Sequence, residues 1–288
     1  VFVFYIALNI MIIFSLDELL EIFSQNSGIG KVRGLYLTIL SLAWVFSQTI
    51  SGKILGSFTF SALYFISSIL MVLFFLVVFF LLRNLPDPEY DKETILATFQ
   101  KFFKNKNLSR AYQINFLLQF FFAFMVIYTP IYLNAHLGFT WSQIGIIFAI
   151  MLTPFVFLPF YLGKYSDKIG ERDMLLFGFL IISIFTLLIP LIKSPTLLIW
   201  ALILFTTRVG AATVEIMSDI YFFKHITASN DEFIGVYRNA QPMAYLLAPL
   251  VAYFIFTFTP AFSFVYLVLG AVMLYGIYLA STIEKTDI

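Results

Sequence analysis

The sequence contains no cysteine and only two histidines, His136 and His225. Disulfides, thiolate metal sites, iron–sulfur clusters and cysteine nucleophiles are therefore excluded, and no histidine cluster can form. Charged side chains are also scarce, since 17 basic and 16 acidic residues make up 11% of the chain. With a net charge of +1 and no basic run interleaved with aromatics, the chain is not suited to bind nucleic acid.

Apolar side chains dominate what is present. Hydrophobic residues make up 61% of the 288 residues, and the mean hydropathy is +0.96. Soluble domains are about 45–50% apolar and about 25% charged, so the surplus must face a second apolar medium, which is lipid. Apolar runs of about 20 residues, the length of a membrane-spanning helix, predict an all-α polytopic membrane protein with about nine spans. These spans cover residues 1–20, 33–55, 60–82, 111–133, 141–162, 173–192, 196–222, 233–257 and 261–281.

The long connection at 84–110 carries most of the loop charge and opens with a proline-containing segment. It is the expected boundary between a partial N-terminal helix bundle (1–83, three helices) and a six-helix C-terminal bundle (111–288).

The distribution of basic residues predicts the orientation. If the 84–110 loop is cytoplasmic, 13 of the 17 basic residues lie on that side, and only Lys53 and Lys193 lie on the other. The C-terminus is then cytoplasmic as well. We expect an integral protein of the plasma (cytoplasmic) membrane.

An internal repeat is expected at an offset of about 201 residues, where the segment 33–48 aligns with the segment 234–249. By this alignment the first bundle lacks about three spans. We therefore expect the sequence to be truncated at its N-terminus, in agreement with the missing initiator methionine.

A charged loop with two glycines lies between the fifth and sixth predicted spans. It contains Gly163, Asp167, Lys168, Gly170 and Arg172. The glycines permit a tight reversal, the aspartate can face the positive end of a neighbouring helix, and the basic residues favour the cytoplasmic side. An ordinary loop that obeys the positive-inside rule is the alternative interpretation.

This loop resembles the signature of the major facilitator superfamily of secondary transporters, Gly-x-x-x-Asp-Arg/Lys-x-Gly-x-Arg/Lys. That family also has an acid near the end of one helix and a basic residue with glycine at the start of the next. The two copies here would be Asp17 with Arg33 and Gly34, and Asp219 with Gly235, the second lacking the basic residue. The resemblance implies two bundles of six helices, of which helices 4 to 12 are present, and gives the loop and these helix ends a role in gating.

Polar residues inside the predicted spans are candidates for substrate binding or ion coupling: Gln119, Arg208, Glu215 and Arg238. At about 100° per residue, Arg208, Glu215 and Asp219 share one helix face. An arginine at the bilayer midplane costs about 2.5–3.5 kcal/mol, which favours an Arg208 that faces a cavity. There it would attract an anionic or carboxylate-bearing solute or modulate a protonatable glutamate. Glu215 and Arg238 would lie at similar depth and could form a structural ion pair or take part in coupling.

The predicted function is secondary active transport of a small solute by alternating access, without catalysis and without a cofactor. The expected partners are a small-molecule substrate, the lipid bilayer and protons as a candidate coupling ion, and the expected form is a monomer. Two alternatives stay open: a transporter-derived sensor or scaffold that moves no solute, and a membrane-embedded transferase. The transferase would need clustered acidic or histidine residues, whereas the acidic residues here are scattered.

Overall fold

The computed structural model describes residues 29–83, 94–159, 170–226 and 232–283, together with residues 8, 9, 11, 12, 15, 16 and 162; for residues 29–38 it describes the backbone alone. All regular structure in these ranges is helical, which confirms the predicted fold class. The α-helices are α2 (Ile29–Ser57), α3 (Phe60–Leu82), α4 (Ile95–Lys104), α5 (Lys106–Ile131), α6 (Trp141–Leu152), α8 (Glu171–Leu188), α9 (Leu197–Lys224), α10 (Glu232–Arg238), α11 (Ala240–Phe258) and α12 (Phe264–Ser281). A π-helix, η1 (Tyr132–His136), follows α5, and a 3-10 turn, η2 (Ile189–Leu191), follows α8.

Seven of the described helical segments are long and apolar enough to cross a membrane. One is Phe60–Leu82, and the other six lie between Lys106 and Ser281. They correspond to seven of the nine predicted spans, so the polytopic membrane architecture is confirmed. The predicted span 33–55 lies within α2, which is described only in part, and most of the predicted span 1–20 lies outside the described residues.

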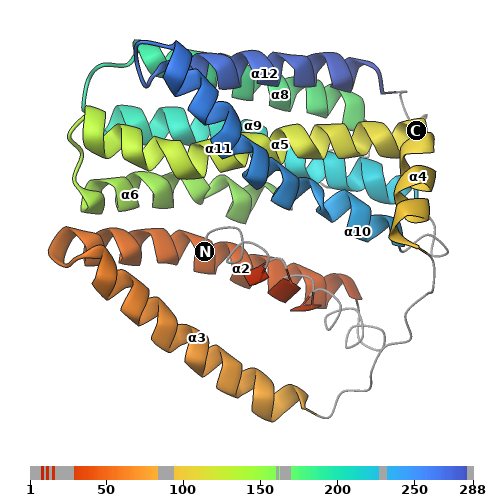
Figure 1. Ribbon diagram of the computed structural model, residues 1–288, viewed down its shortest axis with the longest axis horizontal. Helices are drawn as coiled ribbons and strands as arrows, with labels where there is room; N and C mark the ends of the chain where they lie inside the picture. Colours follow the sequence, from red (N-terminus) through yellow and green to blue (C-terminus); the bar gives the residue numbers. More distant parts are fainter. Residues whose placement is uncertain are drawn as a thin grey trace.

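The six spans from α5 onward form one bundle, and α2 and α3 lie on one side of it (Figure 1). Within the bundle α5 contacts α9, α11 and α12, and α8 packs between α9 and α12. α2 packs on α6 and is the described helix that joins the N-terminal segment to the bundle. The large apolar side chains of α5 and α9 fill the interior, and Phe121, Phe124, Trp200 and Phe222 are fully or almost fully buried.

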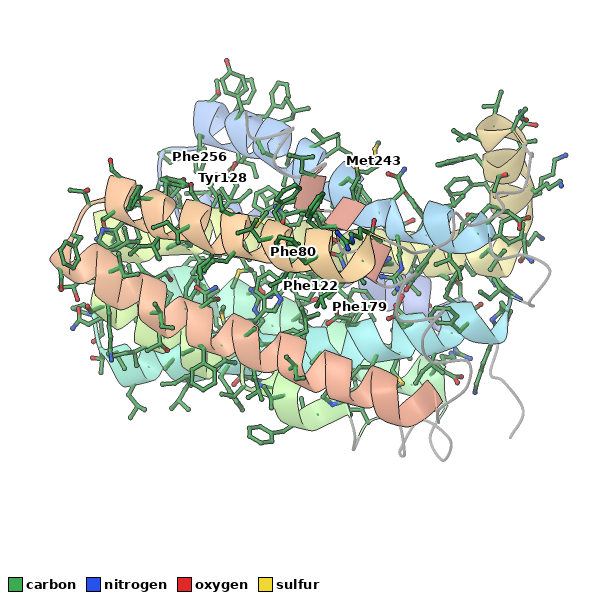
Figure 2. All side chains as sticks on the ribbon, turned by 90° about the horizontal axis from the view of Figure 1, so that it is seen from below. Phe80, Phe122, Tyr128, Phe179, Met243 and Phe256 are labelled. Atoms are coloured by element: carbon green, nitrogen blue, oxygen red, sulfur yellow. The ribbon has the colours of Figure 1, made fainter. Side chains whose placement is uncertain are left out.

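α3 differs from the helices of the bundle because it has no buried residue. Most of its side chains are apolar and exposed, Phe80 (labelled in Figure 2) among them. A largely apolar helix with no buried residue suits contact with lipid.

The prediction of a loop over residues 84–110 was wrong in one part. Residues 95–104 form the helix α4, and α5 begins at Lys106 instead of residue 111. Asn105 divides the two helices. Its side chain accepts hydrogen bonds from the backbone N–H groups of Asn107 (3.0 Å) and Leu108 (3.3 Å) and so caps α5. A search for apolar runs of about 20 residues cannot find an amphipathic helix as short as α4.

One further local difference has a backbone cause. The predicted span 233–257 is divided at Asn239 into α10 and α11. Pro242 has no N–H to donate to the carbonyl of Arg238, so the helical hydrogen-bond ladder is interrupted at this point. His136 is exposed as the last residue of η1, and the centroid of its ring lies 4.8 Å from that of Phe262.

Candidate functional site

Arg208 lies near the middle of α9, as the twelfth of its 28 residues, and is 2% exposed. Its guanidinium carbon lies 4.9 Å from the ring centroid of Phe122 and 5.5 Å from that of Phe121, both on α5. Phe122, which is half-buried, is labelled in Figure 2. Cation–π contacts of this kind contribute roughly 0.5–2 kcal/mol. The charge is thus held between two helices inside the bundle, away from lipid.

The hydrogen-bond donors of Arg208 are not all satisfied. Nε and Nη2 are buried and have no acceptor among the described residues. These two nitrogens share one edge of the planar guanidinium, the edge that can donate two parallel hydrogen bonds to a carboxylate. A buried donor without an acceptor costs about 1–3 kcal/mol, so such groups are rare in folded proteins. Chemically, this edge is suited to bind an anion with two oxygens in one plane.

Glu215 lies seven residues after Arg208 on α9, about two turns along the same face, and is half-buried. Arg238 is exposed at the end of α10 and makes other contacts. In the described part of the chain Glu215 and Arg238 form no ion pair with each other. The structural ion pair that the sequence suggested for them is therefore not supported.

A chain of hydrogen bonds connects α5, α9 and α10. Gln119 Nε2 donates to Asn115 Oδ1 (3.4 Å), and Asn115 Nδ2 donates to the carbonyl oxygen of Tyr237 (3.2 Å). The hydroxyl of Tyr237 donates to Asp219 Oδ1 (2.9 Å) and lies 2.9 Å from the hydroxyl of Ser218. The structure thus connects Asp219, at the end of one membrane helix, to the start of the next, and it includes Gln119 in the same network.

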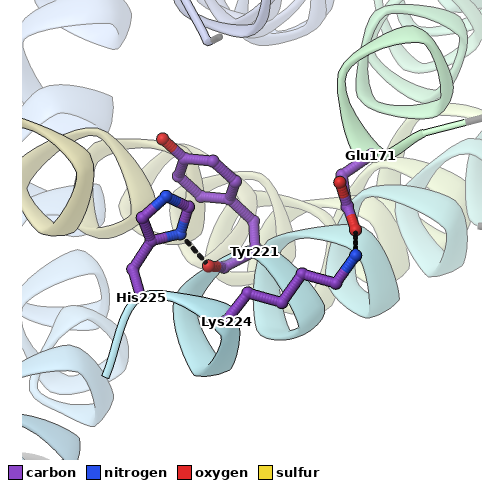
Figure 3. A network of polar contacts seen from close by, with 4 residues as sticks. All are labelled: Glu171, Tyr221, Lys224 and His225. Carbon is purple, nitrogen blue, oxygen red and sulfur yellow. Dashed lines mark hydrogen bonds and ion pairs between the residues drawn. The ribbon is translucent and has the colours of Figure 1, made fainter. Parts of the chain in front are cut away.

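The same end of α9 also bonds to the start of α8 (Figure 3). Lys224 Nζ donates to Oε1 of Glu171, whose side chain is 2% exposed. His225 Nδ1 lies 2.7 Å from the carbonyl oxygen of Tyr221, one of the terminal carbonyls that a helix leaves without an intrahelical partner. These contacts satisfy polar groups where two helices end.

Part of the signature loop is described. Gly163, Asp167 and Lys168 lie outside the described residues. Gly170 has φ +84°, in the left-handed region that side chains disfavour, and this agrees with the expected tight reversal before α8. Arg172 is half-buried, and its Nε has no acceptor among the described residues.

The other predicted helix-end residues are only partly placed. Asp17 lies outside the described residues, and Arg33 and Gly34 belong to the segment of α2 that is described by its backbone alone. Gly235 lies in α10, and no atom lies within 4 Å of the position that a Cβ would take there. Packing therefore does not require glycine at this position.

A close helix contact joins α2 to α6. A Cβ on Gly52 would lie 2.7 Å from Cα of Gly145, and a Cβ on Gly145 would lie 2.7 Å from the carbonyl oxygen of Gln48. Ser142 Oγ donates to the carbonyl oxygen of Gly52 (3.4 Å). Because the atoms in the way belong to the backbone, any larger residue would force the two helices apart. The contact lies toward the end of the bundle that the predicted topology places outside the cytoplasm.

Sequence reasoning missed several residues of these networks. Asn115 could have been found in the sequence, because it is an amide one helical turn before Gln119 in an otherwise apolar span. Glu171 had a weaker signal, as an acid in the first turn after Gly170. Phe121 and Phe122 had none, because nothing in the sequence separates them from the other members of a set of 37 phenylalanines.

Within the described ranges, no group of three or more His, Asp or Glu side chains is placed to hold a metal ion. Residues 19–230 match the family model described as Major Facilitator Superfamily. Among curated proteins no match to the chain is found.

Proposed function

The chain belongs to the major facilitator superfamily, a family of membrane transporters, and on this basis we propose that it carries a small organic anion across the membrane by alternating access. The observation that supports an anion is the buried Nε and Nη2 edge of Arg208, which has no acceptor among the residues that the structure describes. A carboxylate of the solute supplies two acceptor oxygens to this edge. The transported solute then supplies the acceptors that these two donors lack among the described residues.

The surroundings of Arg208 favour one direction of approach. Phe121 and Phe122 lie within 5.5 Å of the guanidinium carbon, so the rings restrict access to the guanidinium and hold its orientation. The ligand must approach in the guanidinium plane, at the edge formed by Nε and Nη2, which is buried in this conformation and must become accessible before the solute binds. This geometry favours a planar carboxylate, and a neutral amide of the same shape is disfavoured because its NH2 group would face an N–H donor.

Glu215 is the proposed coupling residue. It is half-buried on the same helix face as Arg208, and the described residues provide no ion pair with Arg238 that would give it a structural role. A carboxyl group that can take up a proton beside the path of an anion permits symport of the anion with a proton. Protons are thus the coupling ion that we propose.

Alternating access requires contacts at both ends of the bundle that open in turn. At the extracytoplasmic end we assign this role to the close contact of α2 and α6 at Gly52 and Gly145. At the cytoplasmic end we assign it to the signature loop and the helix ends. The residues proposed to form this cytoplasmic gate are Gly163, Asp167, Lys168, Gly170 and Arg172, with Asp17, Arg33, Gly34, Asp219 and Gly235.

We propose that the end of the bundle with α4, the end of α9 and the C-terminus faces the cytoplasm, and that the protein acts as a monomer in the cytoplasmic membrane. The support for the orientation is the excess of basic residues on the connections at that end.

Uptake of radiolabelled lactate and of its neutral amide, lactamide, by the full-length protein in proteoliposomes tests the anion proposal. We expect uptake of lactate above empty vesicles, inhibition by excess nicotinate and no inhibition by nicotinamide. An imposed inward proton gradient is expected to increase lactate uptake. Equal transport or equal inhibition by the carboxylates and the amides would contradict the proposal.

A further inference from the structure

The helix α4 has an apolar face that the bundle does not cover. Its buried face contains Thr98 and Phe102, four residues apart, which are 7% and 0% exposed. Leu96 and Phe103, seven residues apart, lie on another face and are 70% and 42% exposed. Short amphipathic helices that expose large apolar side chains next to basic ones typically lie in a membrane interface.

The helix is fixed to the bundle by aromatic packing. The ring of Phe102 contacts those of Tyr112 on α5, Phe222 on α9 and Phe233 on α10, with centroid distances of 6.2, 6.3 and 5.6 Å. α4 therefore packs against the ends of three helices. In Figure 1 it runs across the ends of the long helices instead of along them, so its axis lies roughly in the plane expected for the membrane surface.

Charge on α4 and the first turn of α5 has one sign. Residues 95–110 contain four basic side chains, Lys101, Lys104, Lys106 and Arg110, and no acidic one. Lys104 and Lys106 are exposed, and within the described ranges neither forms an ion pair. The inner leaflet of a cytoplasmic membrane is negatively charged, and each basic residue near it adds to the attraction.

We propose that α4 is an interfacial anchor of the C-terminal bundle, with Leu96 and Phe103 at the level of the acyl chains and the basic residues of 95–110 against anionic phospholipid headgroups. Lipid is the occupant that fits both features of the helix. An apolar face next to a cluster of positive charge matches the boundary between acyl chains and anionic headgroups, and the proposed orientation puts this end of the bundle at that boundary. Through Phe102 the anchor holds the ends of α9 and α10 at a fixed depth.

Fluorescence quenching of a label on a single introduced cysteine tests the position of the apolar face, because these 288 residues contain no cysteine that would react. The variants are Leu96→Cys and, about 100° around the same helix, the matched control Ala97→Cys. Each is labelled with bimane and placed in vesicles of phosphatidylcholine and phosphatidylglycerol. We expect brominated acyl chains to quench the label at position 96 several-fold more than the label at position 97, and aqueous iodide to do the reverse.

Equal quenching by iodide at both positions would overturn the proposal, because position 96 would then face water. Protection of position 96 from both quenchers would also overturn it, since a segment of protein and not lipid would cover this face.

The charge component has a separate test. In mixed vesicles, brominated phosphatidylglycerol is expected to quench the label at position 96 more strongly than brominated phosphatidylcholine. Changing Lys104→Gln and Lys106→Gln is expected to reduce this preference by about fivefold for each charge removed. Lys193→Gln, an exposed lysine at the opposite end of the bundle, is the control and is expected to leave the preference unchanged. A preference that survives the double substitution would contradict the role of these charges.

Discussion

The polar groups at the end of α9 have hydrogen-bond partners, whereas those in its middle are only partly satisfied. At the end, Lys224 bonds to Glu171, and Asp219 accepts a hydrogen bond from the hydroxyl of Tyr237. In the middle, Arg208 is 2% exposed, yet two of its donors have no acceptor among the described residues. Polar groups that are satisfied within the fold contribute to its stability, whereas a buried charge that lacks acceptors costs free energy. On our proposal the contacts at the end of α9 hold helix ends together, those of the cytoplasmic gate included, and the middle of α9 binds the ligand.

The largest effect is expected at the middle. Arg208→Ala removes the two donors proposed to bind the carboxylate, and loss of a buried charge-assisted contact typically costs about 2–5 kcal/mol. Lactate uptake is therefore expected to fall by at least about 30-fold, and Arg208→Lys to restore only part of it, because lysine cannot present a planar pair of donors.

Arg83→Ala is the matched control for this prediction, since Arg83 is exposed just after α3. It is expected to leave uptake unchanged. Normal uptake by the Arg208→Ala variant would contradict the ligand-binding role proposed for Arg208.

At the end of α9, Lys224→Met removes the amine that bonds to the buried carboxylate of Glu171. We expect the free energy of unfolding to fall by about 1–3 kcal/mol, while lactate uptake at permissive temperature stays near the wild-type rate. Denaturant titration monitored by circular dichroism measures the first effect, with Lys193→Met as an exposed control. Wild-type stability in the Lys224→Met variant would show that the contact is not structural.

The close contact of α2 with α6 allows a test of the proposed gate. In Gly52→Ala the new methyl group would lie 2.7 Å from Cα of Gly145, so the helices must separate. We expect the protein to favour the outward-open form, with several-fold faster labelling of a Gln48→Cys reporter by an impermeant maleimide added outside. An unchanged labelling rate would show that this contact does not control access.

The smallest effect is expected for Tyr237→Phe. This substitution removes the hydroxyl that contacts Asp219 and Ser218 but keeps the ring, which stacks on Phe222 at 4.0 Å. The expected loss of stability is about 0.5–1.5 kcal/mol, the usual net contribution of one hydrogen bond. A loss as large as that of Lys224→Met, measured by the same titration, would mean that the network acts as one unit.

Much of the fold could be predicted from the sequence because membrane spans have a strong signal. About 20 apolar residues must be consecutive for a helix to cross lipid, and the spans at 60–82 and 196–222 were found in this way. α4 was missed because its ten residues are too short for that signal. The break at Asn239 was missed because membrane helices tolerate proline, so that Pro242 did not mark the end of a span.

The site was predictable to a smaller extent. Arg208 stood out because a charge in an apolar run is rare and costly. Its neighbours Phe121 and Phe122 could not be found, since which of many phenylalanines contacts an arginine depends on the rotation and depth of two packed helices. The pairing of Glu215 with Arg238 was one of two alternatives from the sequence and is not seen among the described residues, because equal depth in the membrane does not determine which way two side chains point.

The most direct test of the difference between the two regions is the melting temperature of Arg208→Met, measured on the full-length protein with and without nicotinate. Methionine keeps an unbranched side chain between α9 and α5 and removes the buried donors. We predict a melting temperature equal to or higher than that of the wild type, together with loss of the stabilisation that nicotinate gives the wild type. A lower melting temperature with the nicotinate effect retained would show that Arg208 stabilises the fold and does not bind the solute.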